Sequence, residues 1–133
     1  MRFLIVSQYF WPENFRINDL ASELISRGHE VTVLTGLPNY PSGQIFEEYL
    51  ADTEKFSNYK DVRILRVPLL PRGNSALRLL LNYLSFSIAA CVLGPWKLRD
   101  QKFDVVLTCQ LSPVTVGLPG AFLAWLKNAP MIM

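Results

Sequence analysis

Short apolar runs alternate with helical patterns along this chain, and that alternation constrains its fold more than any other feature. Residues 3–6 and 31–34 are runs of apolar and β-branched residues, the pattern of strands buried on both faces. Between them, helical spacing is shown by Ile17, Leu20, Ala21, Leu24 and Ile25. A strand, a helix and a strand within about 35 residues predict two parallel strands joined by a right-handed crossover.

The same alternation continues to residue 133. We expect further strands at residues 62–67, 105–108 and 131–133, and helices at 15–27, 45–50, 75–98 and from Ser112-Pro113 onward. Asn14 is the expected N-cap of the first helix, and Gly28 its C′ glycine. The long helix should end near Gly94-Pro95, and Pro119 should kink the last one. That last helix carries another apolar stripe, formed by Leu118, Ala121, Phe122, Trp125 and Leu126.

These elements predict an α/β fold, a doubly wound and mainly parallel sheet with helices on both faces. Numbered along the chain, the five strands should lie side by side in the order 3-2-1-4-5. A chain of 133 residues is long enough for one core but not for two. No helix follows the last strand, so we expect residues 1–133 to be an incomplete, truncated domain.

Composition narrows the class of protein further. Half of the residues are hydrophobic and 18% are charged, which excludes a disordered chain. The net charge of +2 argues against a dedicated nucleic-acid binder. Residues 67–133, the more apolar half, carry 6 basic and 2 acidic side chains, a pairing that raises the question of a membrane surface. Two cysteines in apolar runs and the lack of a secretory signal at the start indicate the cytoplasm.

The predicted binding edge lies outside the carboxyl ends of the strands, where the strand order reverses. The first strand is followed there by a loop, residues 7–16, with three consecutive aromatic side chains. Its candidate binding residues are Gln8, Tyr9, Trp11, Glu13, Asn14 and Arg16, of which Arg16 could bind a phosphate beside the start of the helix. Other loops at the same edge contribute Asn39, Tyr40, Gln110 and Ser112.

Structural alternatives remain open for these residues. The aromatic side chains could cap the core as a plug, Ser112 could be an ordinary N-cap, and residues 39–40 an ordinary turn. The loop has no Gly-x-Gly-x-x-Gly or phosphate-cradling motif, and no cluster has metal-ligand spacing, so neither a cofactor nor a metal is expected. Nothing in the sequence identifies a catalytic residue.

The run Leu79 to Trp96 contains 18 residues without a charge, the lower edge of transmembrane length. Polar residues follow helical spacing at Ser75, Arg78, Asn82 and Ser85, and basic ones flank the run at Arg72, Arg78, Lys97, Arg99 and Lys102. A buried crossover helix, a helix at a membrane interface and a membrane span are the three interpretations. Peripheral contact through residues 76–99 would place the protein on the inner face of the cell membrane.

Several stretches carry a family resemblance: residues 6–20 with the aromatic loop, 27–36 with Arg-Gly-His-Glu-Val, 37–43 with Asn-Tyr-Pro, 81–86, 112–113 and 115–119. Together they resemble the start of a bacterial retaining GT-B glycosyltransferase of the family 4 type. More narrowly, they are similar to the colanic-acid and O-antigen group that includes L-fucosamine transferases. The resemblance extends over essentially the whole chain.

The resemblance implies two Rossmann-like domains that face a cleft, of which residues 1–133 would be the N-terminal, acceptor-side one. The C-terminal donor domain, with most of the contacts to the nucleotide-diphosphate sugar, would be absent, so this fragment alone is expected to be inactive. The implied reaction transfers a sugar from that donor to a lipid-linked saccharide in cell-surface polysaccharide biosynthesis. The alternative is a non-catalytic α/β interaction or structural fragment with no retained ligand.

Overall fold

The computed structural model describes residues 1–109 and 114–133, and these residues form one six-stranded sheet in the order β3-β4-β2-β1-β5-β6. Five strands run parallel: β1 (Arg2–Val6), β2 (Glu30–Gly36), β4 (Val62–Val67), β5 (Val105–Thr108) and β6 (Met131–Ile132). Their order matches the predicted 3-2-1-4-5. A short strand that was not predicted, β3 (Asn58–Tyr59), pairs antiparallel with β4 at one edge.

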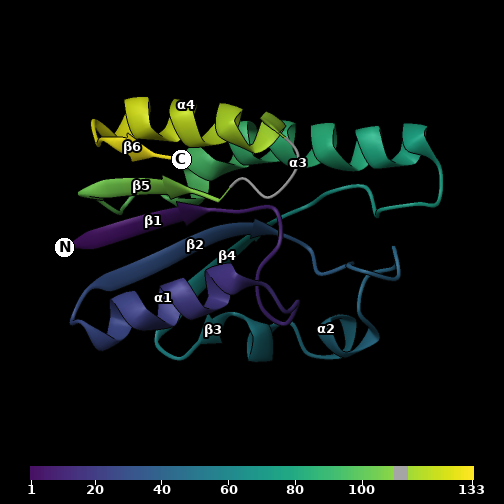
Figure 1. The fold of residues 1–133 in the computed structure, drawn as a ribbon, viewed down its shortest axis with the longest axis horizontal. Coiled ribbons are helices and arrows are strands. Elements are labelled where there is room, and N and C mark those ends of the chain that lie inside the picture. Colours follow the sequence, from purple (N-terminus) through teal and green to yellow (C-terminus); the bar gives the residue numbers. More distant parts are fainter. Residues whose placement is uncertain (110–113) are drawn as a thin grey trace.

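Helices cover both faces of this sheet (Figure 1). One face packs against α1 (Arg16–Ser26), with Ile17 and Ala21 in a core cluster beside Ile5, Val33 and Ile64. The other face packs against α3 (Ala76–Lys97) and α4 (Gly117–Lys127). A short helix, α2 (Glu47–Ala51), and 3-10 turns at Glu54–Phe56 and Val114–Val116 complete the described elements. The predicted doubly wound α/β fold is confirmed.

The two ends of α1 show one correct prediction and one wrong one. Gly28 lies just beyond the helix with φ +81°, and its N–H donates to the Ile25 carbonyl (2.9 Å), as expected of a C′ glycine. The N-cap is Phe15 rather than Asn14. Phe15 has an extended backbone, and its apolar side chain cannot accept a capping hydrogen bond. Its ring stacks 5.3 Å from that of Tyr9 and so holds the chain at this point.

The long helix has its predicted extent, 75–98, to within one residue, but it does not end near Gly94-Pro95, and the proline of the last helix stands in its first turn. The long helix α3 continues through Gly94-Pro95 to Lys97, because the buried Leu98 donates its N–H to the Gly94 carbonyl (2.9 Å) and extends the last turn. In α4, Pro119 is the third helical residue. Backbone N–H groups in the first turn have no partner within the helix, so a proline there breaks no hydrogen bond. The predicted start of this helix at Ser112-Pro113 lies outside the described residues.

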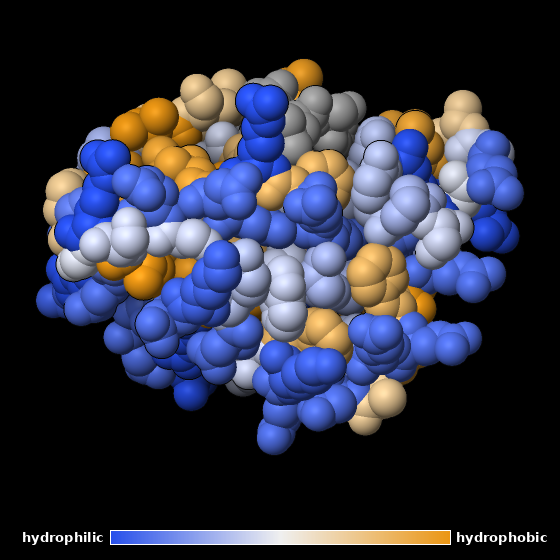
Figure 2. Space-filling view, turned by 60° about the horizontal axis from the view of Figure 1, so that its bottom comes forward, coloured by the Kyte–Doolittle hydropathy of each residue, from blue (hydrophilic) through white to orange (hydrophobic). Residues whose placement is uncertain are grey.

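The apolar stripes of α3 and α4 face away from the sheet. In α4, Leu118 is 65% exposed and Trp125 76%, whereas Gly120, Leu123 and Ala124 are buried. In α3, small and polar residues such as Ala90, Ser87 and Asn82 face inward. By length and composition α3 would suffice to cross a membrane, and only 22% of its 18-residue apolar window is buried. Figure 2, which brings the bottom of Figure 1 forward, shows by contrast a mainly hydrophilic surface.

Candidate functional site

The carboxyl ends of β1, β2 and β4 lead into three segments that meet at one edge of the sheet: residues 7–16, 37–43 and 68–75. The Cys109 N–H after β5 donates to the Val6 carbonyl of β1 (3.0 Å). The strand order therefore reverses between β1 and β5, where the binding edge was predicted.

Glu13 joins the first segment to the second. Its Oε1 accepts hydrogen bonds from the backbone N–H groups of Asn39 (2.9 Å) and Tyr40 (2.8 Å), and its Oε2 accepts one from Phe10 (3.3 Å). The side chain is only 2% exposed, and burial raises the pKa of its carboxyl although the three N–H groups act in the opposite direction. Glu13 thus holds two loops together from inside.

Gln8 and Tyr9 join the first segment to α3 through Asn82, which is fully buried. The Asn82 Oδ1 accepts from Gln8 Nε2 (2.7 Å) and from the Tyr9 hydroxyl (3.4 Å), and its Nδ2 donates to the Leu70 carbonyl (2.6 Å). Burial raises the pKa of the Tyr9 hydroxyl to about 12, against the opposing effect of the Arg72 guanidinium. Gln8 Oε1 is buried without a hydrogen-bond partner among the described residues.

Trp11 lies on the far side of the same loop, away from these contacts. Its ring stacks on Tyr59 (5.2 Å between centroids) and packs against Phe56 (5.1 Å). The Trp11 carbonyl accepts a hydrogen bond from Arg66 (2.5 Å), whose guanidinium also donates to the Gly36 carbonyl (2.9 Å). Burial lowers the pKa of Arg66. On this side the aromatic loop is a structural plug, the alternative that the sequence left open.

A cavity of about 450 Å³ opens between the second and third segments, beside the N-terminus of α3. Its lining includes Tyr40, Ser42, Arg72, Asn74 and Ser75. The Arg72 guanidinium lies 5.2 Å from the centre of the Tyr40 ring and forms no ion pair with a carboxylate of the described residues. An aromatic face, hydroxyls, an amide and a free cation are groups that can bind a sugar and a phosphate.

The predicted site residues separate into groups. Gln8, Tyr9, Glu13, Asn39 and Tyr40 are brought together, but Gln8, Glu13 and Asn39 are buried and hold the loops. Asn14 and Arg16 are exposed, and neither side chain forms a hydrogen bond within the described part of the chain. Gln110 and Ser112 lie outside the described residues. Substrate contact by any of these nine residues, or by Trp11, stays a prediction.

Sequence reasoning did not assign Arg66, Arg72 or Asn82 to this edge. Two of these three residues nevertheless belonged to patterns that the sequence showed. Asn82 stood in the polar stripe of the long helix, and Arg72 among its basic flanks. Their roles depend on partners distant in sequence: the Arg72 N–H donates to Asn39 Oδ1 (3.2 Å), 33 residues away, and Asn82 binds Gln8, 74 residues away. Across residues 1–109 and 114–133, no group of three or more His, Cys, Asp or Glu side chains could hold a metal ion.

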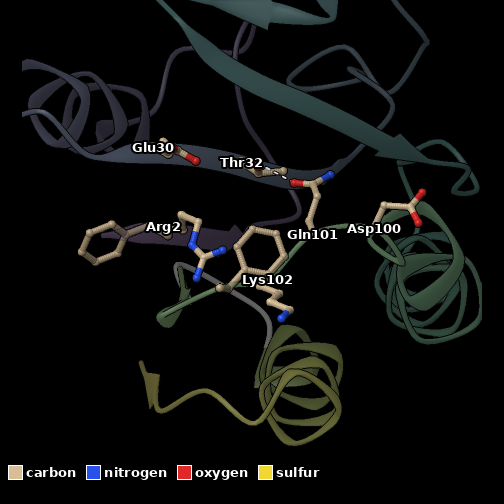
Figure 3. A pocket seen from close by; sticks show the side chains of 8 residues that line it. Arg2, Glu30, Thr32, Asp100, Gln101 and Lys102 are labelled. Carbon is tan, nitrogen blue, oxygen red and sulfur yellow. Dashed lines mark hydrogen bonds between the residues drawn. The ribbon is translucent and has the colours of Figure 1, made fainter.

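A second pocket, of about 210 Å³, lies at the opposite end of the sheet (Figure 3). It is lined by Arg2 and Glu30 at the amino ends of β1 and β2, and by Gln101 and Lys102. Thr32 donates a hydrogen bond to Gln101 Oε1 there (3.0 Å). Because ligands of open parallel sheets bind at the carboxyl ends of the strands, we assign the candidate site to the Tyr40–Arg72 cavity.

Comparisons with known proteins agree with this fold. The C-terminal domain of a hydrogenase from Pyrococcus furiosus superposes with a TM-score of 0.64 at 18% identity, over 98% of this chain and 88% of that one. The glycotransferase of kitacinnamycin gives a TM-score of 0.64 at 17% identity over 98% of this chain. This chain spans 29% of that glycotransferase. At such identities the likeness shows the fold alone.

No curated protein matches the chain. A family model does match, that of the glycosyl transferase 4-like domain, over residues 14–133. The matched region extends from the aromatic loop to the last strand and contains the whole Tyr40–Arg72 cavity. The chain therefore belongs to the glycosyl transferase 4-like domain family, of the GT-B type.

Proposed function

We propose that residues 1–133 form the acceptor-side domain of a retaining glycosyltransferase in cell-surface polysaccharide biosynthesis. It would move a sugar from a nucleotide-diphosphate sugar to a lipid-linked saccharide, at the inner face of the cell membrane. The observation that carries this proposal is the Tyr40–Arg72 cavity at the carboxyl edge of a glycosyl transferase 4-like domain. The exposed apolar helix α3 beside it supports the lipid-linked acceptor and peripheral contact through residues 76–99.

The chemistry of the cavity suits an acceptor of this kind. The Tyr40 ring offers an apolar face to a sugar, and Ser42 and Asn74 supply hydrogen-bonding groups for its hydroxyls. Arg72 can donate two parallel hydrogen bonds to a phosphate oxygen pair, since no carboxylate of the described residues neutralises it. A saccharide linked to lipid through a diphosphate would present both a sugar ring and phosphate oxygens to the cavity.

The donor would be held mainly by a second domain, where charge on the diphosphate leaving group needs cations and backbone N–H donors. From this domain, Arg16 would add a cation at the diphosphate. It is exposed and is the first residue of α1, where unpaired N–H groups favour an anion. Contact between Arg16 and the donor diphosphate is part of the proposal.

The test uses the full-length enzyme, a panel of nucleotide-diphosphate sugars and a polyprenyl-diphosphate saccharide in detergent. Arg72→Met keeps an unbranched apolar stem and removes the charge, so kcat/KM for the acceptor should fall roughly 10- to 100-fold with an unchanged KM for the donor. Arg63→Met is the matched control, because Arg63 is an exposed arginine of β4 far from the cavity.

An Arg72→Met enzyme with unaltered acceptor kinetics would remove this residue from the site. NMR of the product should show the donor's anomeric configuration, and inversion would contradict the retaining mechanism. A folded full-length protein that binds neither acceptor nor nucleotide sugar would favour the structural alternative.

A further inference from the structure

We propose that α3 and α4 together form one lipid-docking face, which seats the domain on an anionic bilayer surface with both helix axes along that surface. The face consists of exposed side chains of α3, namely Leu77, Leu80, Leu84, Ile88, Val92 and Trp96, and of α4, namely Leu118, Phe122, Trp125 and Leu126. It deepens the membrane contact of the proposed function by adding a second helix, and it does not depend on sugar transfer.

The first observation is the inverted polarity of α3. Its exposed apolar residues are spaced three or four apart, with Leu77, Ile88 and Val92 each more than 60% exposed. Two of its uncharged polar residues point inward instead, where Asn82 binds Gln8 and the Ser87 hydroxyl donates to the Thr115 carbonyl (2.9 Å). A helix that buries polar side chains toward the rest of the domain and turns leucines outward is built for an apolar environment on its outer side.

The second observation is that α4 continues the same surface. The two helices cover the same sheet face side by side (Figure 1), and Leu123 of α4 lies against Gly94 of α3, 3.3 Å from the position of a Cβ there. The outer side of α4 carries Phe122 stacked on Trp125, with 6.3 Å between ring centroids. Two neighbouring helices that both expose large apolar residues form one continuous patch, and such patches mark interaction sites.

Charge identifies the occupant as an anionic lipid surface. No acidic residue occurs between Val67 and Arg99, nor in α4. Arg72 and Arg78 lie at the amino end of α3, and Lys97 and Arg99 at its other end, where both cations lie within 6 Å of the Trp96 ring. Apolar side chains with a tryptophan and basic groups at the rim match the headgroup boundary of an anionic bilayer.

A second copy of the chain fits this face less well, because both ends of α3 are basic and either two-fold pairing would place like charges together. A membrane span also fits less well. Phe86, Ala90 and Asn82 belong to the core and to the Gln8 contact, so α3 cannot enter the bilayer without leaving the sheet. The hydrophilic surface in Figure 2 agrees with docking on one side only.

The experiment measures co-sedimentation of the full-length protein with phosphatidylglycerol–phosphatidylcholine vesicles, at low and high salt. The variants are Ile88→Ser with Val92→Ser on α3, and Leu118→Ser with Trp125→Ser on α4. Leu50→Ser is the matched control, because Leu50 of α2 is as exposed as Leu118, at 65%, but lies outside the face. Circular dichroism and sedimentation velocity check the fold and the oligomeric state of each.

We expect the unaltered protein to bind the vesicles in a salt-sensitive way. The partition coefficient should drop about tenfold or more for each double variant and should not drop for Leu50→Ser. Full binding by the α4 variant would overturn the two-helix face. So would a protein that ignores vesicles but forms a dimer that either variant dissociates. Transfer to a water-soluble acceptor should survive in both variants. An unaltered protein that binds vesicles in this way but transfers no sugar to any acceptor would refute the proposed function and leave the docking face standing.

Discussion

Glu13 offers the sharpest test of how the candidate site is held together. Its carboxylate is almost fully buried and accepts three backbone hydrogen bonds from two loops, those of Phe10, Asn39 and Tyr40. If this network positions the cavity wall, removing the acceptor must cost stability. The perturbations are Glu13→Ala, which removes the acceptor, and Glu13→Gln, which keeps the shape and removes the charge.

The magnitudes follow from the partners left behind. Glu13→Ala strands three N–H groups, each costing about 1–3 kcal/mol, offset in part because a costly buried charge is also removed, so we expect a net loss of about 3 kcal/mol. In Glu13→Gln the amide oxygen can still accept from Asn39 and Tyr40. The amide nitrogen would face the Phe10 N–H, donor against donor, and we expect a loss of about 1–2 kcal/mol.

The pH dependence has a definite sign. Burial raises the pKa of the Glu13 carboxyl in the folded protein, so the folded state binds this proton more tightly than the unfolded state does. The stability that Glu13 contributes is therefore complete below the unfolded pKa of about 4.3 and declines as the pH rises through the folded pKa. Glutamine does not titrate, so the deficit of Glu13→Gln should be largest in acid and shrink toward neutral pH.

Urea titrations followed by circular dichroism, at pH values on both sides of this range, give the free energy of unfolding of each protein. Comparison of variant with unaltered protein at each pH cancels the other titrating groups. The reasoning is refuted by a loss below about 1 kcal/mol for Glu13→Ala, the value of a single exposed contact, or by a Glu13→Gln deficit that grows with pH.

Three further perturbations address other parts of the fold. Gly120→Ala places a Cβ 2.1 Å from Thr108 Oγ1 of β5, so the free energy of unfolding from urea titrations should fall by about 1–3 kcal/mol. In the control, Gly117→Ala, the added Cβ meets only the Met133 sulfur, at 3.3 Å. Equal effects of the two changes would contradict the close approach of α4 to the sheet. Asn82→Leu strands the Gln8 amide and the Leu70 carbonyl and should lower stability by about 2–4 kcal/mol, whereas an unchanged melting curve would show that this buried contact does not matter. Hydrogen bonds from the backbone and side chain of Arg2 lower the pKa of Asp104, so its contribution is present above the unfolded pKa and lost as the pH falls through the folded one. Asp104→Asn should therefore be less stable than the unaltered protein at neutral pH but equal to it in strong acid, and a pH-independent difference would refute this assignment.

The strand order and the point at which it reverses could be predicted, because alternating apolar runs and helical patterns imply a doubly wound sheet with the common order 3-2-1-4-5. Buried parallel strands read as apolar runs such as residues 3–6, and helical spacing between them implies crossovers. The short strand β3 could not be predicted. It contains two residues and exists only because a turn through Lys60 and Asp61, both at positive φ, folds it back on β4.

The candidate site was predictable only in part. The aromatic loop was expected at this edge, but its division into a plug around Trp11 and a scaffold around Tyr9 depends on distant partners such as Tyr59 and Asn82. A sequence pattern shows which residues are polar. It does not show that Glu13 uses its carboxylate on N–H groups 26 and 27 residues away.

By itself, the sequence determined that two apolar helices lie at residues 75–98 and from Ser112-Pro113 onward, with a polar stripe on the first and an apolar stripe on the second. In the structure these helices are Ala76–Lys97 and Gly117–Lys127. Only the tertiary structure decided which side of each helix meets the sheet. Helical periodicity defines a stripe, but it does not determine the direction in which that stripe points. At Gly120 a Cβ would lie 2.1 Å from Thr108 Oγ1, and at Gly94 it would lie 3.2 Å from a Leu34 methyl group. The small-residue sides therefore fit closely against the sheet, and the leucines and tryptophans face outward.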